Sequence, residues 1–223
     1  LLGLERKTYL GGIRAIQTYV TGMQRIADNF ELASTLLVAS IESLAQDFDG
    51  HDAIWLDYDQ KKRKVIDAAL NGADDDLSEK VRNAILKNEH TSLGKRFREF
   101  AIQHIDSSFY REEAEKAINP LTCFDLQSTL KNAYIARSKY IHNLKQLPKL
   151  LIITSGFTET CRIQNQTWLT LQGLSRLARH VIIQFIMRQP TIEQEPYDYS
   201  LERSNVTQFM LAPQYRIGTI DFS

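Results

Sequence analysis

Apolar residues recur at spacings of three and four along most of this 223-residue chain, and no other feature constrains its fold as strongly. This spacing places apolar side chains on one face of an α-helix, whereas a half-buried strand alternates at every second residue. The pattern predicts helices over residues 13–27, 31–46, 61–70, 78–87, 92–104, 112–118, 125–146 and 167–188. The sequence therefore predicts an all-α fold.

Two of these helices contain most of the expected core. The segment 31–46 is apolar over most of its circumference, so we expect it at the centre of a helical bundle. Asp28 and Asn29 can end the preceding helix or cap this one, and Asp125 is the expected N-cap of the long helix over 125–146. The last helix should cover the core with an apolar stripe made of Trp168, Leu171, Leu174, Leu177, Val181 and Phe185.

The periodicity changes after Pro190. Two β-prone pieces follow, over residues 206–211 and 216–222. We therefore predict a helical domain over 1–189 and a tail over 190–223 that is irregular or forms a short β-hairpin. The chain has no initial methionine, as expected of a piece of a longer protein.

Composition limits the classes of function. Lys and Arg balance Asp and Glu at 27 each, so any site for a polyanion such as RNA must be a local patch. Cys123 and Cys161 lack metal-ligand spacing and are too few for a disulfide framework, so we expect no metal, no cofactor and a reducing cytoplasm. No stretch approaches the roughly 18 apolar residues of a membrane span, so we expect no membrane association.

One charged residue stands within the apolar stripe of the long helix. On a helical wheel of about 100° per residue, Arg137 lies within about 40° of Leu126, Leu130, Ala133, Ile141 and Leu144. Burying a lone charge is very costly, so Arg137 needs an acidic partner, a site opening or a subunit interface. Glu42 of the central helix is the candidate ion-pair partner.

His142 follows Arg137 by five residues, which an ideal helix converts to about 140° around its axis and about 7.5 Å along it. The two side chains are therefore not stacked neighbours. On spacing alone a structural interpretation is favoured, with Arg137 in an ion pair and His142 stabilised by the dipole at the helix C-terminus.

The residues around this pair are more specific. Tyr134 to Asn143 reads Tyr-Ile-Ala-Arg-Ser-Lys-Tyr-Ile-His-Asn and resembles the R-x4-6-H signature of HEPN domains, in the RS-x-x-x-H form of the Apea-like branch. Leu36 to Leu44 is similar to that branch's helix with an apolar-Glu-x-Leu core. With the insert between the two segments and the amphipathic helix after the motif, the resemblance covers roughly residues 13–188. Ser138 departs from the Asn, Asp or His that more often follows the arginine.

The resemblance implies a HEPN-like helical bundle that forms a homodimer, with the two motifs facing one another in a composite endoribonuclease site. Arg137 and His142 would be catalytic, Glu42 would support them, and no metal would be required. The residues expected to contact the RNA substrate are Lys139, Ser138 and Asn143. The family context implies a toxin or an antiviral-defence effector that works with a sensor domain or an antitoxin partner.

The residue types suit cleavage of RNA by its own 2′-hydroxyl. That reaction needs a base for the hydroxyl, an acid for the leaving 5′-oxygen and positive charge for the phosphorane. Histidine titrates near neutral pH, and arginine offers a fork of donors to phosphate oxygens. Two histidines, one from each subunit, would supply both proton transfers.

Other interpretations stay open. The chain could be a catalytically inactive HEPN module that binds RNA, nucleotide or a partner protein, or a purely structural helical scaffold. Two further basic clusters could bind single strands, although a solvated helix face is favoured for each: Lys61, Lys62, Arg63 and Lys64, and Lys95, Arg96 and Arg98 among Phe97 and Phe100. The histidines without metal spacing, expected to be structural, are His51, His90, His104 and His180.

Overall fold

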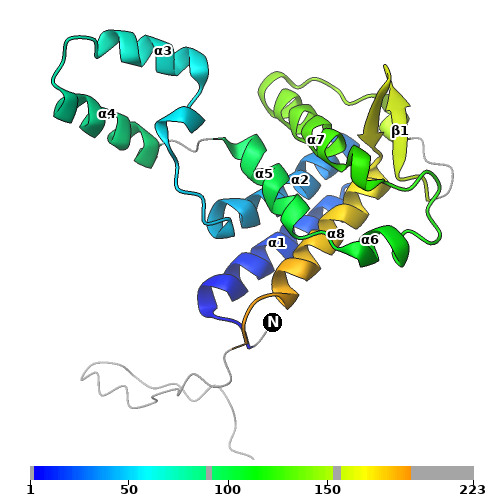
Figure 1. Cartoon of the computed structure of the whole chain (residues 1–223). Coiled ribbons are helices and arrows are strands. Elements are labelled where there is room, and N and C mark those ends of the chain that lie inside the picture. Colours follow the sequence, from blue (N-terminus) through cyan, green and yellow to red (C-terminus); the bar gives the residue numbers. More distant parts are fainter. Residues whose placement is uncertain (1–2, 89–91, 153–156, 192–223) are drawn as a thin grey trace, which may run out of the picture. The chain divides into compact units, whose positions relative to one another are not determined.

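The computed structural model describes residues 3–88, 92–152 and 157–191 (Figure 1). Within these ranges the chain forms eight α-helices and one antiparallel pair of strands, so the expected all-α fold is confirmed, with a short β-hairpin at residues 160–169, before the last helix. The two β-prone pieces predicted over 206–211 and 216–222 lie outside the described residues. No helix in the described ranges combines the length and the apolar character needed to cross a membrane.

One helix occupies the centre of the fold, as its apolar circumference predicted. This helix, α2 (Phe30–Phe48), packs against α1 (Arg6–Gln24), α5 (Leu93–Gln103), α7 (Cys123–Asn143) and α8 (Leu171–Met187) (Figure 1). The side chains of Leu37, Ile41 and Leu44 are fully buried among these neighbours. Asn29, one of the two capping candidates, is the N-cap of α2, since its side chain accepts a hydrogen bond from the backbone N–H of Leu32.

Aromatic side chains fill the space between α5, α8 and the short helix α6 (Ser107–Arg111). Phe97, Phe100, Phe109 and Phe185 are all fully buried. Phe97 and Phe100 therefore cannot stack on nucleic-acid bases, so the predicted basic and aromatic patch on α5 is not a strand-binding surface.

The helices α3 (Gln60–Ala69) and α4 (Asp75–Asn88) form a separate pair beside the 3-10 turn η1 (Trp55–Asp57). The Asp67 carboxylate accepts hydrogen bonds from the Trp55 indole at 3.0 Å and from Arg82 at 2.7 Å. No side chain of α3 is buried, and the Asp67 carboxylate joins α3 to η1 and α4.

The strands β1 (Thr160–Ile163) and β2 (Gln166–Leu169) form the hairpin, which lies between α7 and α8. Its two turn residues, Gln164 and Asn165, both have positive φ, at 50° and 60°. Two consecutive positive-φ residues give the hairpin turn whose twist matches that of its strands. A 3-10 turn, η2 (Lys149–Leu151), precedes the hairpin.

The hairpin is fastened to α7 by side chains of that helix. The Asn132 amide donates to the backbone oxygen of Thr167 at 3.0 Å, and the Thr167 hydroxyl donates to Asp125 at 3.1 Å. The sequence suggested Asp125 as the N-cap of α7, and this prediction is wrong. Thr122 is the N-cap, because its hydroxyl oxygen accepts the backbone N–H of Asp125.

Several predicted helix bounds are wrong. The first helix, α1, begins at Arg6 rather than at residue 13. Residues 112–118 do not form a helix, since 112–116 form turns, and α6 lies earlier because Asp106 caps it by accepting the Ser108 N–H. The last helix begins at Leu171 instead of residue 167, since Thr170 caps it and the residues before it form β2. The long helix ends at Asn143, because Leu144 adopts the left-handed conformation with φ of 49°.

Candidate functional site

Arg137 points from α7 toward the central helix α2, where it meets Glu42. The Nη2 atom of Arg137 lies 2.5 Å from Oε2 of Glu42, and the two side chains are 20% and 4% exposed. The other carboxylate oxygen of Glu42 accepts a hydrogen bond from the Tyr134 hydroxyl at 3.1 Å. The ion pair predicted for Arg137 is thus present, with Tyr134 as a third member that the sequence analysis did not single out.

Tyr134 links this ion pair to the aromatic core. Its ring centroid lies 5.5 Å from that of Phe97, and the Arg137 guanidinium stands 5.6 Å from the Tyr134 ring centroid. Burial raises the pKa of Tyr134 to about 12, and the negative charge of Glu42 adds to the shift. Tyr134 therefore remains a neutral donor to Glu42 at any physiological pH.

The apolar stripe assigned to α7 is shorter than expected. Leu126, Leu130 and Ala133 are buried, but Ile141 is 45% exposed and Leu144 is 76% exposed. The helix then ends, because Leu144 adopts the left-handed conformation. Arg137 consequently lies at the end of the buried stripe and not at its middle.

His142 occupies the last turn of α7 and is exposed. Nothing in the described part of the chain forms a hydrogen bond or ion pair with it. Because α7 is helical from Cys123 to Asn143, His142 is turned by about 140° from Arg137 and set about 7.5 Å further along the axis. The structure therefore joins Arg137 to Glu42 but does not join Arg137 to His142 within one chain.

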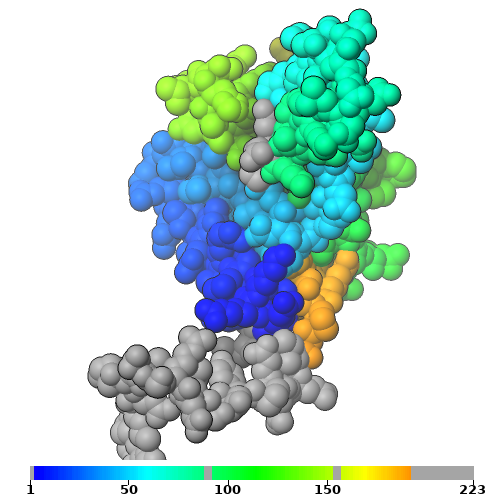
Figure 2. All heavy atoms as spheres, turned by 90° about the vertical axis from the view of Figure 1, so that its left-hand side faces the viewer, coloured from blue at the N-terminus to red at the C-terminus, as the bar shows by residue number. Residues whose placement is uncertain are grey.

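The expected substrate contacts lie around His142. Lys139 and Asn143 are exposed, whereas Ser138 is half-buried. Lys139 precedes His142 by three residues, so the two side chains are neighbours on the helix surface. Figure 2 shows, in yellow-green, that the chain around the end of α7 reaches the surface on one face of the molecule.

This part of the chain is locally cationic although the whole chain is neutral. Residues 126–152 contain five Lys or Arg and no acidic residue, and residues 126–192 contain nine Lys or Arg and only Glu159 as an acid. Glu159 is buried and paired with Arg176. Phosphate groups near α7 would therefore meet cations without facing an exposed carboxylate from this segment.

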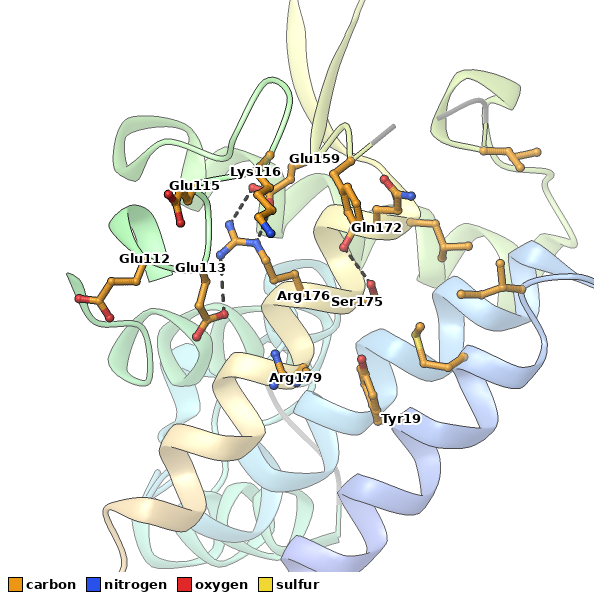
Figure 3. A pocket seen from close by; sticks show the side chains of 16 residues that line it. Tyr19, Glu112, Glu113, Glu115, Lys116, Glu159, Gln172, Ser175, Arg176 and Arg179 are labelled. Atoms are coloured by element: carbon orange, nitrogen blue, oxygen red, sulfur yellow. Dashed lines mark hydrogen bonds and ion pairs between the residues drawn. The ribbon is translucent and has the colours of Figure 1, made fainter. Parts of the chain in front are cut away.

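A cavity of about 640 Å³ lies between α1, the turns after α6 and α8 (Figure 3). The charged pair on its wall is Arg176 with the more deeply buried Glu159, and the Arg176 guanidinium donates to Glu159 and to the backbone oxygen of Phe109, each at 2.7 Å. The Nδ1 atom of buried His180 lies 2.7 Å from the Glu113 carboxylate, while its Nε2 has no hydrogen-bond partner among the described residues. Because Arg176, Glu159 and Glu113 are engaged with neighbouring groups, a structural role is favoured for the cluster.

The other histidines and basic clusters have structural partners as well. His51 lies 3.1 Å from Asp57, and burial lowers the pKa of His104, whose ring contacts the backbone oxygen of Phe100. Arg96 is held by Asp49 at 2.6 Å in a largely buried ion pair. His90 lies outside the described residues. Among those described, no three His, Cys, Asp or Glu side chains form a group that could hold a metal ion.

Comparison with known proteins yields no relative: no family model, no curated protein and no solved structure matches the chain. The HEPN resemblance therefore rests on the sequence features alone, which are the motif, the Leu36 to Leu44 segment and the spacing between them. The geometry adds to them the Glu42, Tyr134 and Arg137 cluster and an exposed histidine beside it on a cationic helix.

Proposed function

We propose that this protein is an endoribonuclease that needs no metal, with His142 as the residue that transfers protons. The observation that carries the proposal is the setting of His142, an exposed imidazole without a partner among the described residues, in a segment of five Lys or Arg and no acid. Such a surface attracts the phosphate backbone, and an imidazole can take or give a proton near neutral pH.

The reaction requires two proton transfers, which a single histidine cannot perform at once. The RNA 2′-hydroxyl attacks the adjacent phosphorus while one His142 accepts its proton. The P–O bond to the 5′-oxygen breaks, and the partner subunit's His142 donates a proton to that oxygen. The products are a 2′,3′-cyclic phosphate and a free 5′-hydroxyl, and the composite site implies a homodimer that pairs through the C-terminal end of α7.

Arg137 fits this site as a group held in one orientation. Its guanidinium has five N–H donors, and Glu42 engages one end of it, while Nε is buried with no partner in the described part of the chain. Glu42 and Tyr134 fix the guanidinium, and the remaining donors can reach a phosphate once a second subunit and RNA approach. Lys139 and Asn143 are exposed next to His142 for further contacts, with half-buried Ser138 behind them.

A second candidate function is favoured by the same ion pair. Because Glu42 offsets the charge of Arg137, the motif can stabilise the bundle without touching a substrate. The protein would then be an inactive HEPN-like module that binds RNA, nucleotide or a partner protein. The free thiols of Cys123 and Cys161 fit a reducing cytoplasm under either proposal, and a sensor domain or an antitoxin would be the regulatory partner.

Cleavage of a labelled RNA in EDTA tests the proposal. Wild type should release fragments with 2′,3′-cyclic phosphate ends, and His142→Ala should not. Gln146→Ala, an exposed change one turn further along the chain, is the matched control and should cleave like wild type. RNA binding by wild type without cleavage would support the inactive module, and cleavage that persists in His142→Ala would overturn the role of His142.

A further inference from the structure

A groove of about 470 Å³ runs between α7 and the β-hairpin, which lie next to each other in Figure 1. The α7 wall includes Lys131, Ile135 and Lys139. The hairpin wall includes Gln166, Thr167 and Trp168.

The α7 wall of the groove leads toward His142. On a helical wheel, Ile135, Lys139 and His142 lie about 40°, 80° and 20° from Lys131, so all four side chains share one side of the helix. Lys139 stands about 12 Å along the axis from Lys131, and His142 about 4.5 Å beyond it. Arg137, by contrast, is turned about 120° away from Lys131, toward α2.

Both lysines of the groove are exposed and have no acidic partner within the described ranges. Asp125 is the one acidic residue among those that line it, and its carboxylate accepts hydrogen bonds from the hydroxyls of Thr122 and Thr167. The distance along α7 from Lys131 to Lys139 equals the length of roughly two to four nucleotides of single-stranded RNA. The groove thus offers two free cations in line with the proposed catalytic histidine.

Trp168 supplies a donor without an acceptor. Its indole Nε1 is buried and has no hydrogen-bond partner among the described residues. An indole N–H can only donate, and a buried unpaired donor is costly unless a ligand or water completes it. The Trp168 ring packs on a small core that includes Ala136, Leu147 and Leu151, so it is a donor held in place and not a free stacking platform.

We propose that this groove binds single-stranded RNA. The strand extends along the groove from the phosphate that is cleaved at His142 toward Lys131. The identity of the ligand rests on the proposed function, while the site itself rests on the groove, its two free lysines and its unpaired indole. Lys131 and Lys139 bind consecutive parts of the phosphate backbone. The Trp168 N–H, which is covered in this structure, donates to an oxygen or nitrogen of a nucleotide once the side chains around it shift.

Fluorescence anisotropy with a labelled oligouridine about twelve nucleotides long tests the groove. His142→Ala serves as the background, so that cleavage does not interfere with binding. In about 0.1 M salt, Lys131→Gln and Lys139→Gln should each weaken binding about fivefold and lower the salt-dependence slope by about 0.7. Trp168→Phe, which keeps a ring but removes the N–H, should weaken binding roughly two- to tenfold.

Lys87→Gln is the matched control, since it makes the same charge change at an exposed lysine of α4. It should leave affinity and salt slope unchanged. Equal weakening by Lys87→Gln, or unchanged affinity and slope in the double variant Lys131→Gln/Lys139→Gln, would overturn the groove.

These outcomes separate the two proposals. Weaker binding by the groove variants together with no cleavage by wild type would keep the groove and remove the endoribonuclease. Cleavage that depends on His142, with binding unaffected by the groove variants, would keep the endoribonuclease and remove the groove.

Discussion

Replacing Glu42 by alanine should destabilise the fold through two neighbouring groups at once. Arg137, only 20% exposed, would lose its counter-charge, and the Tyr134 hydroxyl would lose its acceptor. Removing one partner of a buried ion pair costs about 3–5 kcal/mol. Because Arg137 is partly exposed, we expect the free energy of unfolding to fall by about 3 kcal/mol. For a chain of this size the melting temperature should fall by about 6–12 °C.

Thermal unfolding followed by far-ultraviolet circular dichroism measures this loss. Glu79→Ala removes an exposed glutamate of α4 and should change stability by less than about 0.5 kcal/mol. In the double variant Glu42→Leu/Arg137→Met, apolar side chains replace both charges, and stability should recover to within about 1 kcal/mol of wild type. If Glu42→Ala melts like wild type, or the double variant is no better than Glu42→Ala, the cluster does not support the fold as argued.

Three further predictions concern the same helix. His142→Ala should slow RNA cleavage by about 10²–10⁴-fold and leave the helical circular-dichroism spectrum unchanged. Arg137→Ala should slow cleavage by about 10²–10³-fold and also lower the stability of the fold. Cleavage at the wild-type rate in a gel assay would contradict either prediction. Because the pKa of Tyr134 is raised to about 12, its contribution to stability is present below pH 10 and should be lost as the pH rises toward 12. Denaturant unfolding should show a larger loss in wild type than in Tyr134→Phe, because Tyr19 and Tyr110, whose pKa values burial also raises, contribute the same loss to both. Sedimentation at micromolar concentration should show a dimer, and a strict monomer would contradict the composite site.

The sequence predicted those parts of the fold that depend on helical periodicity and burial. The central position of α2 follows from its apolar circumference, and Leu37, Ile41 and Leu44 are indeed fully buried. The pairing of Arg137 with Glu42 was predictable because a charge at the edge of the core must be compensated. The function of the motif, however, rests on resemblance and on the two lysines and histidine that share one side of α7.

Local signals were weak where the prediction failed. Trp168 precedes Leu171 by three residues, as expected of two apolar residues on one helical face. It nevertheless belongs to β2, because apolar spacing alone does not mark where a helix begins. The hairpin turn was missed because Gln164 and Asn165 adopt positive φ without a glycine. The groove could not be predicted from the sequence, since it depends on the hairpin folding back onto α7 through Asn132.

A subunit-mixing experiment tests the composite site most directly. Wild-type protein at a fixed concentration is mixed with tagged His142→Ala in about ninefold excess. Exchange of subunits is verified when wild-type chains co-purify with the tagged variant. If each site needs His142 from both subunits, random pairing leaves about one tenth of the wild-type chains with a wild-type partner, so RNA cleavage should fall about tenfold. Cleavage that stays unchanged after verified exchange would contradict a site shared between two subunits.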